Sequence, residues 1–144
     1  MPKTQIIVAP DLSILVEKAA ARIAERVSQS DTPVAVCLTG GSTPKPVYDR
    51  LAREPYNSSL PWDKIHWFWG DDRFVPIEDE RSNAGMAIKA LLRETPVPPD
   101  NIHPIPTERN SLGDASRIYQ EELKSFYGQN QLDPMDPLFD IVLM

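Results

Sequence analysis

Cysteine is nearly absent from this sequence, because Cys37 is the only one among 144 residues. A single cysteine excludes an internal disulfide framework and a zinc site built from four thiolates. Cys37 lies in an apolar run, so we interpret it as a buried and inert thiol. The only histidines, His66 and His103, fit no metal-binding spacing, and the sequence therefore indicates no metal site.

Long apolar runs and an excess of positive charge are also missing. No stretch approaches the roughly 20 apolar residues of a membrane span, and the N-terminus has no apolar segment typical of a secretory signal. We therefore expect a cytoplasmic protein without membrane contact. The net charge is −6, from 15 Lys and Arg against 21 Asp and Glu. This balance disfavours a nucleic-acid surface, so any anionic ligand is expected to be small and locally held.

The apolar pattern that is present predicts strands alternating with helices. Helical spacing predicts helices over 12–27, 44–51, 82–92 and 111–127, with Asp11 capping the first and Gly128 ending the last. Strands are expected at 5–8, 34–38, 62–69, 102–105 and 138–144. This alternation indicates an α/β fold, a mainly parallel twisted sheet with helices on both faces, modified from the Rossmann arrangement. Such sheets bind ligands at the carboxyl ends of their strands.

The first unusual segment at such an end is 38–45, Leu-Thr-Gly-Gly-Ser-Thr-Pro-Lys. Its two glycines permit backbone conformations that a Cβ forbids, and a helix start beyond them offers N–H groups to an anion. Two hydroxyls and a lysine add further donors, so phosphate is the expected guest. The GxGxxG and P-loop patterns are both absent. A plain strand-to-helix turn with a Ser or Thr cap explains the same residues, and both interpretations stay open.

The second unusual segment is 70–76, Gly-Asp-Asp-Arg-Phe-Val-Pro, after a tryptophan-rich strand. Arg73 offers a planar fork suited to phosphate, and an aspartate here can orient it or accept a sugar hydroxyl. A structural Asp–Arg loop pair is the alternative. Arg81 and the Ser82-Asn83 pair could fold back toward the same site, although a helix cap explains Ser82 and Asn83 equally well.

Taken together, these blocks resemble the 6-phosphogluconolactonase family from near one end of the sequence to the other. The resemblance rests on the order and spacing of 38–45, Tyr48, 62–69, 70–76, 82–83 and 139–143. It implies a fold akin to the glucosamine-6-phosphate deaminase group and hydrolysis of 6-phospho-D-glucono-1,5-lactone to 6-phosphogluconate in the oxidative pentose phosphate pathway. It also implies that no cofactor is needed. Asp72 stands where the family usually has Glu.

Residue roles follow from the resemblance alone. The substrate loop is expected to contain Gly40, Gly41, Ser42 and Thr43. Asp71 and Arg73 are expected to contact the phosphorylated sugar acid, with Lys45 and Asn83 as further candidates. The expected partner is a small phosphorylated sugar lactone, bound by a monomer or a weak homodimer.

The catalytic base is the main departure from the family. There, the strand matching 139–143 leads into a loop with an Asp-Gly-His triplet, whose histidine is the expected general base. No such triplet occurs in this sequence, which ends at Met144. We therefore expect residues 1–144 to form a single lactonase-type domain truncated after the strand 138–144, nearly inactive because it lacks the base.

Two other functions stay open. One is a non-catalytic sugar-phosphate-binding protein. The other is a deaminase-type isomerase, which is disfavoured because that group has Asp-Glu-Tyr where this sequence has Asp71-Asp72-Arg73.

Overall fold

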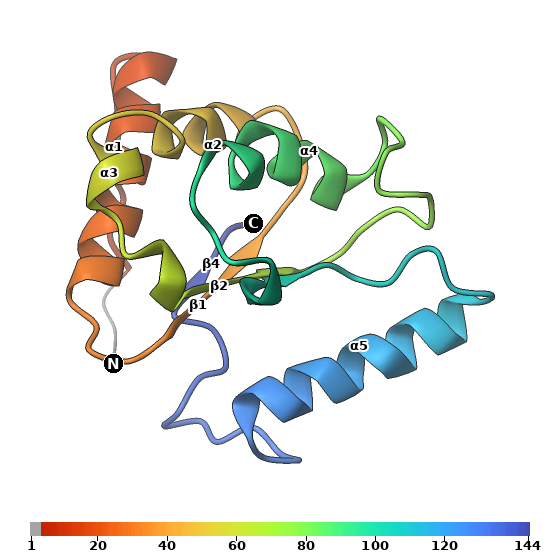
Figure 1. Ribbon diagram of the computed structural model, residues 1–144. Helices are drawn as coiled ribbons and strands as arrows, with labels where there is room; N and C mark the ends of the chain where they lie inside the picture. Colours follow the sequence, from red (N-terminus) through yellow and green to blue (C-terminus); the bar gives the residue numbers. More distant parts are fainter. Residues whose placement is uncertain (1–3) are drawn as a thin grey trace.

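Four parallel strands form the centre of the molecule. A computed structural model describes residues 4–144 and gives the strand order β3-β2-β1-β4 (Figure 1). The long central pair is β1 (Val34–Leu38) and β2 (Ile65–Trp69), paired in register from Val34↔Ile65 to Leu38↔Trp69. The flanking strands β3 (Ile102–His103) and β4 (Ile141–Val142) have two residues each. The predicted α/β fold with a parallel sheet is confirmed.

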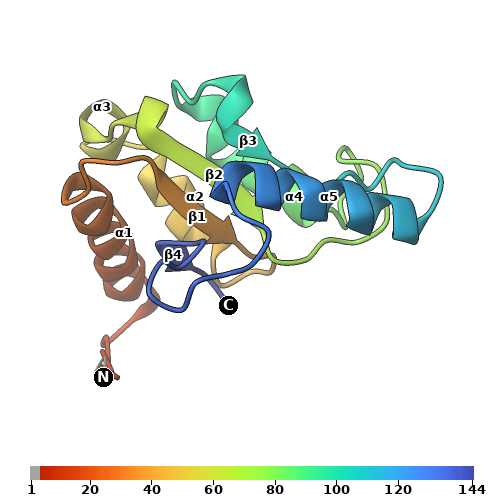
Figure 2. The same ribbon diagram turned by 90° about the horizontal axis from the view of Figure 1, so that it is seen from below.

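Helices cover both faces of this sheet. Figures 1 and 2 place α1 (Leu12–Ser28), α2 (Lys45–Leu51) and α4 (Asn83–Ala90) on one side and α5 (Leu112–Tyr127) on the other. The short α3 (Tyr56–Ser59) joins the first group. Side chains alternate across the strands. Val36 and Trp67 therefore pack on the side of α1 to α4, while Ala35 and Phe68 pack toward α5.

Local sequence signals set the helix ends as predicted. The Asp11 carboxylate accepts a hydrogen bond from the Ile14 N–H at the start of α1. Gly128 ends α5 in a left-handed conformation with φ of 80°, which a residue without a Cβ adopts readily. Cys37 is buried, as predicted, and burial raises the pKa of its thiol. Among the described residues, no helix is both long and apolar enough to cross a membrane.

Some of the predicted strands are shorter than expected or absent. Residues 5–8 form no strand, and Ile6 and Val8 are 85% and 84% exposed. Apolar composition alone does not make a strand, because a strand needs a neighbour for its backbone N–H and C=O groups. Residues 62–64 form a 3₁₀ turn ahead of β2, and the expected strands at 102–105 and 138–144 shrink to two residues each.

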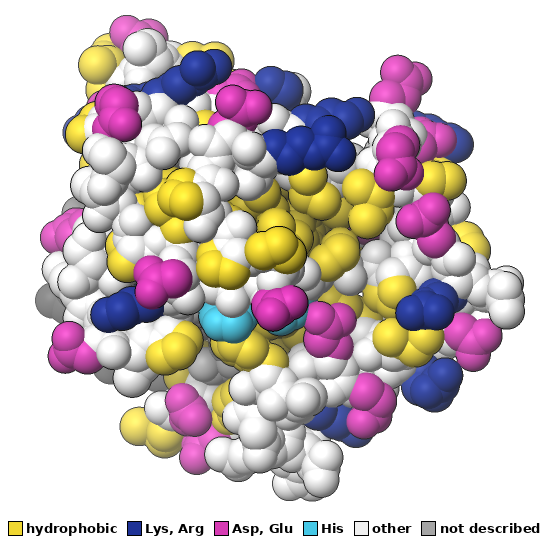
Figure 3. Space-filling view, in the orientation of Figure 1, with side chains coloured by type: hydrophobic (Ala, Val, Ile, Leu, Met, Phe, Trp, Pro, Cys, Tyr) yellow, Lys and Arg dark blue, Asp and Glu magenta, His cyan; other side chains and the backbone are white. Residues whose placement is uncertain are grey.

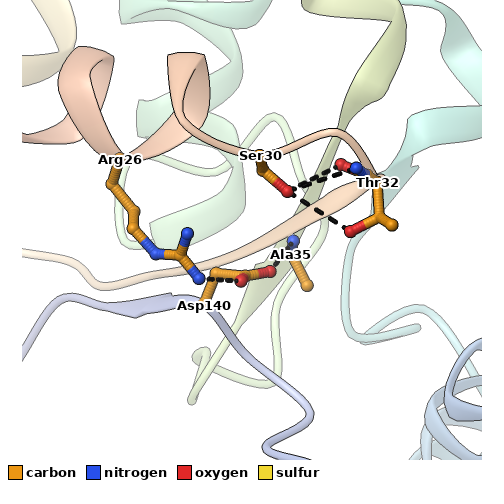
Figure 4. Close-up of polar contacts among 5 residues, drawn as sticks. All are labelled: Arg26, Ser30, Thr32, Ala35 and Asp140. Carbon is orange, nitrogen blue, oxygen red and sulfur yellow. Dashed lines mark hydrogen bonds and ion pairs between the residues drawn. The ribbon is translucent and has the colours of Figure 1, made fainter.

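A side chain compensates for the shortness of β4. The Asp140 N–H donates to the Ala35 carbonyl at 2.9 Å, while its Oδ2 accepts from the Ala35 N–H at 3.0 Å (Figure 4). The other carboxylate oxygen accepts from Arg26 of α1 at 2.6 Å. Asp140 thus ties β4, β1 and α1 together at one point.

We expect Asp140→Asn to destabilise the protein by about 1–2 kcal/mol, because the amide cannot accept from both donors and loses the charge that faces Arg26. Urea unfolding of both proteins measures the change in the free energy of unfolding. Asp114→Asn is the matched control, since its ion pair with Arg117 is long, at 3.9 Å, and exposed. Equal effects from the two substitutions would contradict a special role for Asp140.

Candidate functional site

A cavity of about 920 Å³ opens beyond the carboxyl ends of β1 and β2. Both unusual segments of the sequence contribute to its wall, together with the start of α4. Parallel sheets bind ligands at this edge, so the position agrees with the expected one. The lining residues are Gly41, Ser42, Lys45, Asp72, Arg73, Phe74, Val75, Glu80, Arg81, Ser82, Asn83 and Met86.

The first loop fits closely against Asn83. A Cβ added to Gly40 would lie 1.9 Å from the Asn83 Oδ1, so any larger residue at this position would force Asn83 or the loop to move. Gly41 has a φ of 101°, a conformation that side chains with a Cβ rarely adopt. Asn83 also donates from its Nδ2 to the Asp71 carbonyl at 3.2 Å. This one side chain therefore bridges the two loops.

The hydroxyls of the first loop do not cap the helix that follows. No side chain makes a capping hydrogen bond at the start of α2, so the Ser or Thr cap considered from the sequence is wrong. Ser42 and Thr43 are both exposed, and Ser42 lines the cavity. Ser42 therefore borders a space that a ligand can occupy.

The second loop is organised by Asp72. Its carboxylate accepts from the main-chain N–H of Arg73 at 2.7 Å and from the first two N–H groups of α4, those of Asn83 and Ala84, at 2.6 and 3.0 Å. The structural Asp–Arg pair considered from the sequence is therefore not formed through the guanidinium. Within residues 4–144, the Arg73 side chain makes no ion pair, and it lies exposed on the cavity wall.

The other cations of the cavity already have partners. Lys45 lies 2.8 Å from Asp49 in an exposed pair one helical turn away. Arg81 holds Asp79 through two side-chain hydrogen bonds of 2.9 and 2.7 Å, and these bonds lower the pKa of Asp79 to about 2. Arg73 is consequently the cation with most capacity for a new anionic partner.

The candidate residues are thus distributed over the site in three ways. Five of the eight line the cavity: Gly41, Ser42, Lys45, Arg73 and Asn83. Gly40 and Thr43 line an adjoining hollow between α1 and α2. The exposed Asp71 joins the site through its carbonyl, which accepts from Asn83. Contact between these residues and a substrate remains a prediction.

Two buried tyrosines fix the strand ends, a role that no local sequence pattern indicates. The Tyr48 hydroxyl donates to the Thr39 carbonyl at 2.8 Å and accepts from the Thr39 N–H at 3.1 Å. Tyr119 does the same for Trp69, at 2.9 and 3.0 Å. Burial raises the pKa of Tyr48 to about 12 and also raises the pKa of Tyr119, so both hydroxyls keep their proton. Each tyrosine satisfies a strand end just where a loop of the site begins.

The two histidines form a hydrogen-bonded chain on the α5 side of the sheet. The His66 Nδ1 lies 3.0 Å from the His103 Nε2, and the His103 Nδ1 lies 2.7 Å from a carboxylate oxygen of Glu122 on α5. Figure 3 shows histidine side chains, in cyan, at the surface of the molecule. Among residues 4–144, no three His, Cys, Asp or Glu side chains are arranged to hold a metal ion. The pair is packed, and it joins β2 and β3 to α5.

We expect acid to weaken the fold at this pair. Burial, and then the proximity of His103, lowers the pKa of His66 below its usual 6.5. The unfolded chain therefore binds the proton more readily, and the free energy of unfolding falls as the pH is lowered through about 6.5. Urea unfolding at pH 7.5 and 5.5 measures this loss. His66→Asn, whose amide nitrogen takes the place of Nδ1 beside His103 but does not titrate, should lose less stability over the same interval. An identical loss would contradict the assignment.

Comparison with known proteins identifies relatives of this chain. The model of the family described as glucosamine-6-phosphate isomerases/6-phosphogluconolactonase matches residues 10–144. The chain is 36% identical over 144 residues to a 6-phosphogluconolactonase of Synechocystis, covering 97% of this chain and 57% of that protein. It is 41% identical over 98 residues to the 6-phosphogluconolactonase of Haemophilus influenzae, covering 68% of this chain and 42% of that one.

Solved structures agree with the fold. The chain superimposes on the 6-phosphogluconolactonase from Trypanosoma cruzi with a TM-score of 0.80 and 29% identity, covering 97% of this chain and 57% of the other. The chain thus spans about half the length of the relatives it matches.

Proposed function

Because the chain belongs to the family of glucosamine-6-phosphate isomerases and 6-phosphogluconolactonases, we propose that the protein hydrolyses 6-phospho-D-glucono-1,5-lactone to 6-phosphogluconate. The observation that carries the proposal is the exposed Arg73 on the wall of a cavity that Gly41 and Ser42 also line. A guanidinium binds a phosphate monoester through two parallel hydrogen bonds. The isomerase group has tyrosine at this position, and a tyrosine offers no such charge.

The reaction divides into substrate binding and water attack. Water adds to the C1 carbonyl of the lactone, a base takes a proton from the water, and the bond between C1 and the ring oxygen then breaks. The ring oxygen leaves as the C5 hydroxyl after accepting a proton. Arg73 would hold the phosphate at the far end of the substrate, which fixes C1 in position and lowers the barrier. Ser42 and Asn83 offer hydrogen-bond donors toward the sugar.

The proton acceptor is assigned to a group outside the cavity wall described above. Within residues 4–144, the lining of this cavity contains no histidine. His66 and His103 are engaged with each other and with Glu122 on the α5 side. We propose that residues 1–144 form a single domain that binds the substrate. In keeping with a role in the oxidative pentose phosphate pathway, we place the protein in the cytoplasm as a monomer or a weak homodimer.

Two measurements on the purified protein test the proposal. Calorimetry on residues 1–144 should detect binding of 6-phosphogluconate, the stable product. In the full-length protein, a pH-stat should detect release of acid from the lactone faster than in buffer. Binding by the full-length protein without faster hydrolysis favours the second candidate, a non-catalytic sugar-phosphate-binding protein. Absence of both results would refute a sugar-phosphate function.

A further inference from the structure

Asp72 is the most completely bonded side chain in the cavity wall. Its Oδ1 accepts from the Arg73 and Asn83 N–H groups, and its Oδ2 accepts from the Ala84 N–H and, at 3.3 Å, from the Ser82 hydroxyl. An ionised carboxylate has about four lone-pair directions for hydrogen bonds. These four protein donors fill them. Asp72 therefore has little capacity left for a sugar hydroxyl, although it lines the cavity.

The same bonds close the start of α4 to any other anion. Asp72 takes the N–H groups of Asn83 and Ala84, the Ser82 hydroxyl accepts from the Gly85 N–H at 2.9 Å, and the Ser82 carbonyl accepts from Met86. Every N–H group of the first turn is thus satisfied from within the protein. A substrate phosphate in the cavity therefore receives no donor from the start of α4.

We propose that Asp72 is a positioning residue, which holds the backbone N–H groups of Arg73 and Asn83, and through them the two side chains, in the arrangement that receives the substrate phosphate. The inference rests on the proposed function, since it explains how the sugar-phosphate site is assembled. Through Oδ1, one carboxylate oxygen connects the residue that carries the guanidinium to the residue whose amide bridges both loops. The two sides of the cavity are therefore held in place by a single group.

Positioning and simple electrostatics predict opposite results for Asp72→Asn. The substitution removes a negative charge from the cavity wall, so Coulomb's law alone predicts tighter binding of a phosphorylated acid. Positioning predicts weaker binding, because the amide cannot accept from all four donors and its own N–H₂ meets donors. Asp72→Glu keeps the carboxylate, and glutamate is the residue that the family usually has at this position.

The first measurement is titration calorimetry with 6-phosphogluconate on the wild-type protein and on the variants Asp72→Asn and Asp72→Glu. Asp114→Asn on α5 is the charge-matched control. We expect Asp72→Asn to raise Kd by about tenfold or more at unchanged stoichiometry, since small displacements of a binding group have effects of this size. Asp72→Glu and the control should bind nearly as the unvaried protein does. An unchanged or lower Kd overturns the proposal. A lower stoichiometry at unchanged Kd also overturns it, because partial unfolding alone gives that result.

The second measurement needs no ligand. Hydrogen exchange in Asp72→Asn should be faster at the Arg73, Asn83 and Ala84 amides, whereas the amides of α5 keep their rates. Asp72→Ser retains a single acceptor and replaces Asp72→Asn in both measurements where that variant does not fold, with the same results expected. If the unvaried protein does not bind 6-phosphogluconate, the proposed function fails, and the exchange rates still decide the role of Asp72. Unchanged exchange at the three amides overturns the positioning role.

Discussion

Arg73→Ala is expected to raise the Kd for 6-phosphogluconate by about 10- to 100-fold, the largest effect of any single side chain in the cavity. A hydrogen bond to a charged group contributes about 1.5–3 kcal/mol, and each 1.4 kcal/mol corresponds to a factor of ten. Arg73 makes no ion pair within residues 4–144, so its removal leaves no partner unpaired and costs little stability. Calorimetric titration measures the affinity, and urea unfolding checks that the fold is intact.

Two further variants sharpen this test. Arg73→Lys keeps the charge but loses the planar fork, so it should restore only part of the affinity if the guanidinium binds phosphate through two bonds. Arg117→Ala removes an exposed arginine of α5 and is the matched control. If Arg73→Ala binds 6-phosphogluconate as well as the control does, Arg73 has no anchoring role, and the anion is held by Lys45 or Arg81.

The parts of the fold that the sequence predicted are those with local causes. The run 34–38 contains five consecutive apolar residues, which is typical of a strand covered on both faces, and β1 is fully buried. Asp11 and Gly128 set helix ends through bonds and backbone angles within a few residues. The strand at 5–8 was wrong because strand formation depends on a partner far away in the sequence, and no local pattern contains that information.

The site divides in the same way. Gly40, Gly41 and Arg73 stood out because glycine pairs and an arginine after a strand suit an anion in any fold of this class. Asp72 attracted attention only as a departure from the family pattern, because its role depends on donors ten to twelve residues later.

The hydrogen bonds of Tyr48 and Tyr119 to the strand ends, and the histidine pair, were missed for the same physical reason. Tyr119 is 50 residues from the strand end that it binds, and His66 is 37 residues from His103. Helical spacing predicted the helix over 111–127 that carries Tyr119, but it does not say what a buried hydroxyl meets there. Hydrogen-bond partners of buried side chains are set by packing, which the order of strands and helices decides.

Gly40→Ala is expected to lower the free energy of unfolding by about 1–3 kcal/mol, the usual cost of overpacking a filled site. The new methyl carbon would lie 1.9 Å from the Asn83 Oδ1 and 2.4 Å from its Cγ, so one of the two residues must move. Asn83 cannot swing away without losing its hydrogen bond to the Asp71 carbonyl. The variant should therefore also bind 6-phosphogluconate more weakly, because the two loops can no longer meet through Asn83.

Asn83→Ala turns this expectation into a double-mutant cycle. Alone, it removes one largely buried hydrogen bond and should cost about 1 kcal/mol. In Gly40→Ala/Asn83→Ala the methyl group has room, so the double variant should be more stable than the sum of the single effects predicts, with a coupling of about 0.5–3 kcal/mol. Additive effects would show that the loss of stability at Gly40 does not come from the close contact with Asn83.

The control for backbone conformation is Gly113→Ala near the start of α5. The nearest atom to its added Cβ is the Ser111 Oγ at 3.9 Å, so the methyl group meets no obstacle, and alanine should stabilise the helix by about 0.4–1 kcal/mol. Opposite signs at Gly40 and Gly113 would separate steric contact from backbone entropy. Gly40 and Asn83 then set the distance between the two loops, and the stability cycle and the loss of 6-phosphogluconate affinity should report the same contact.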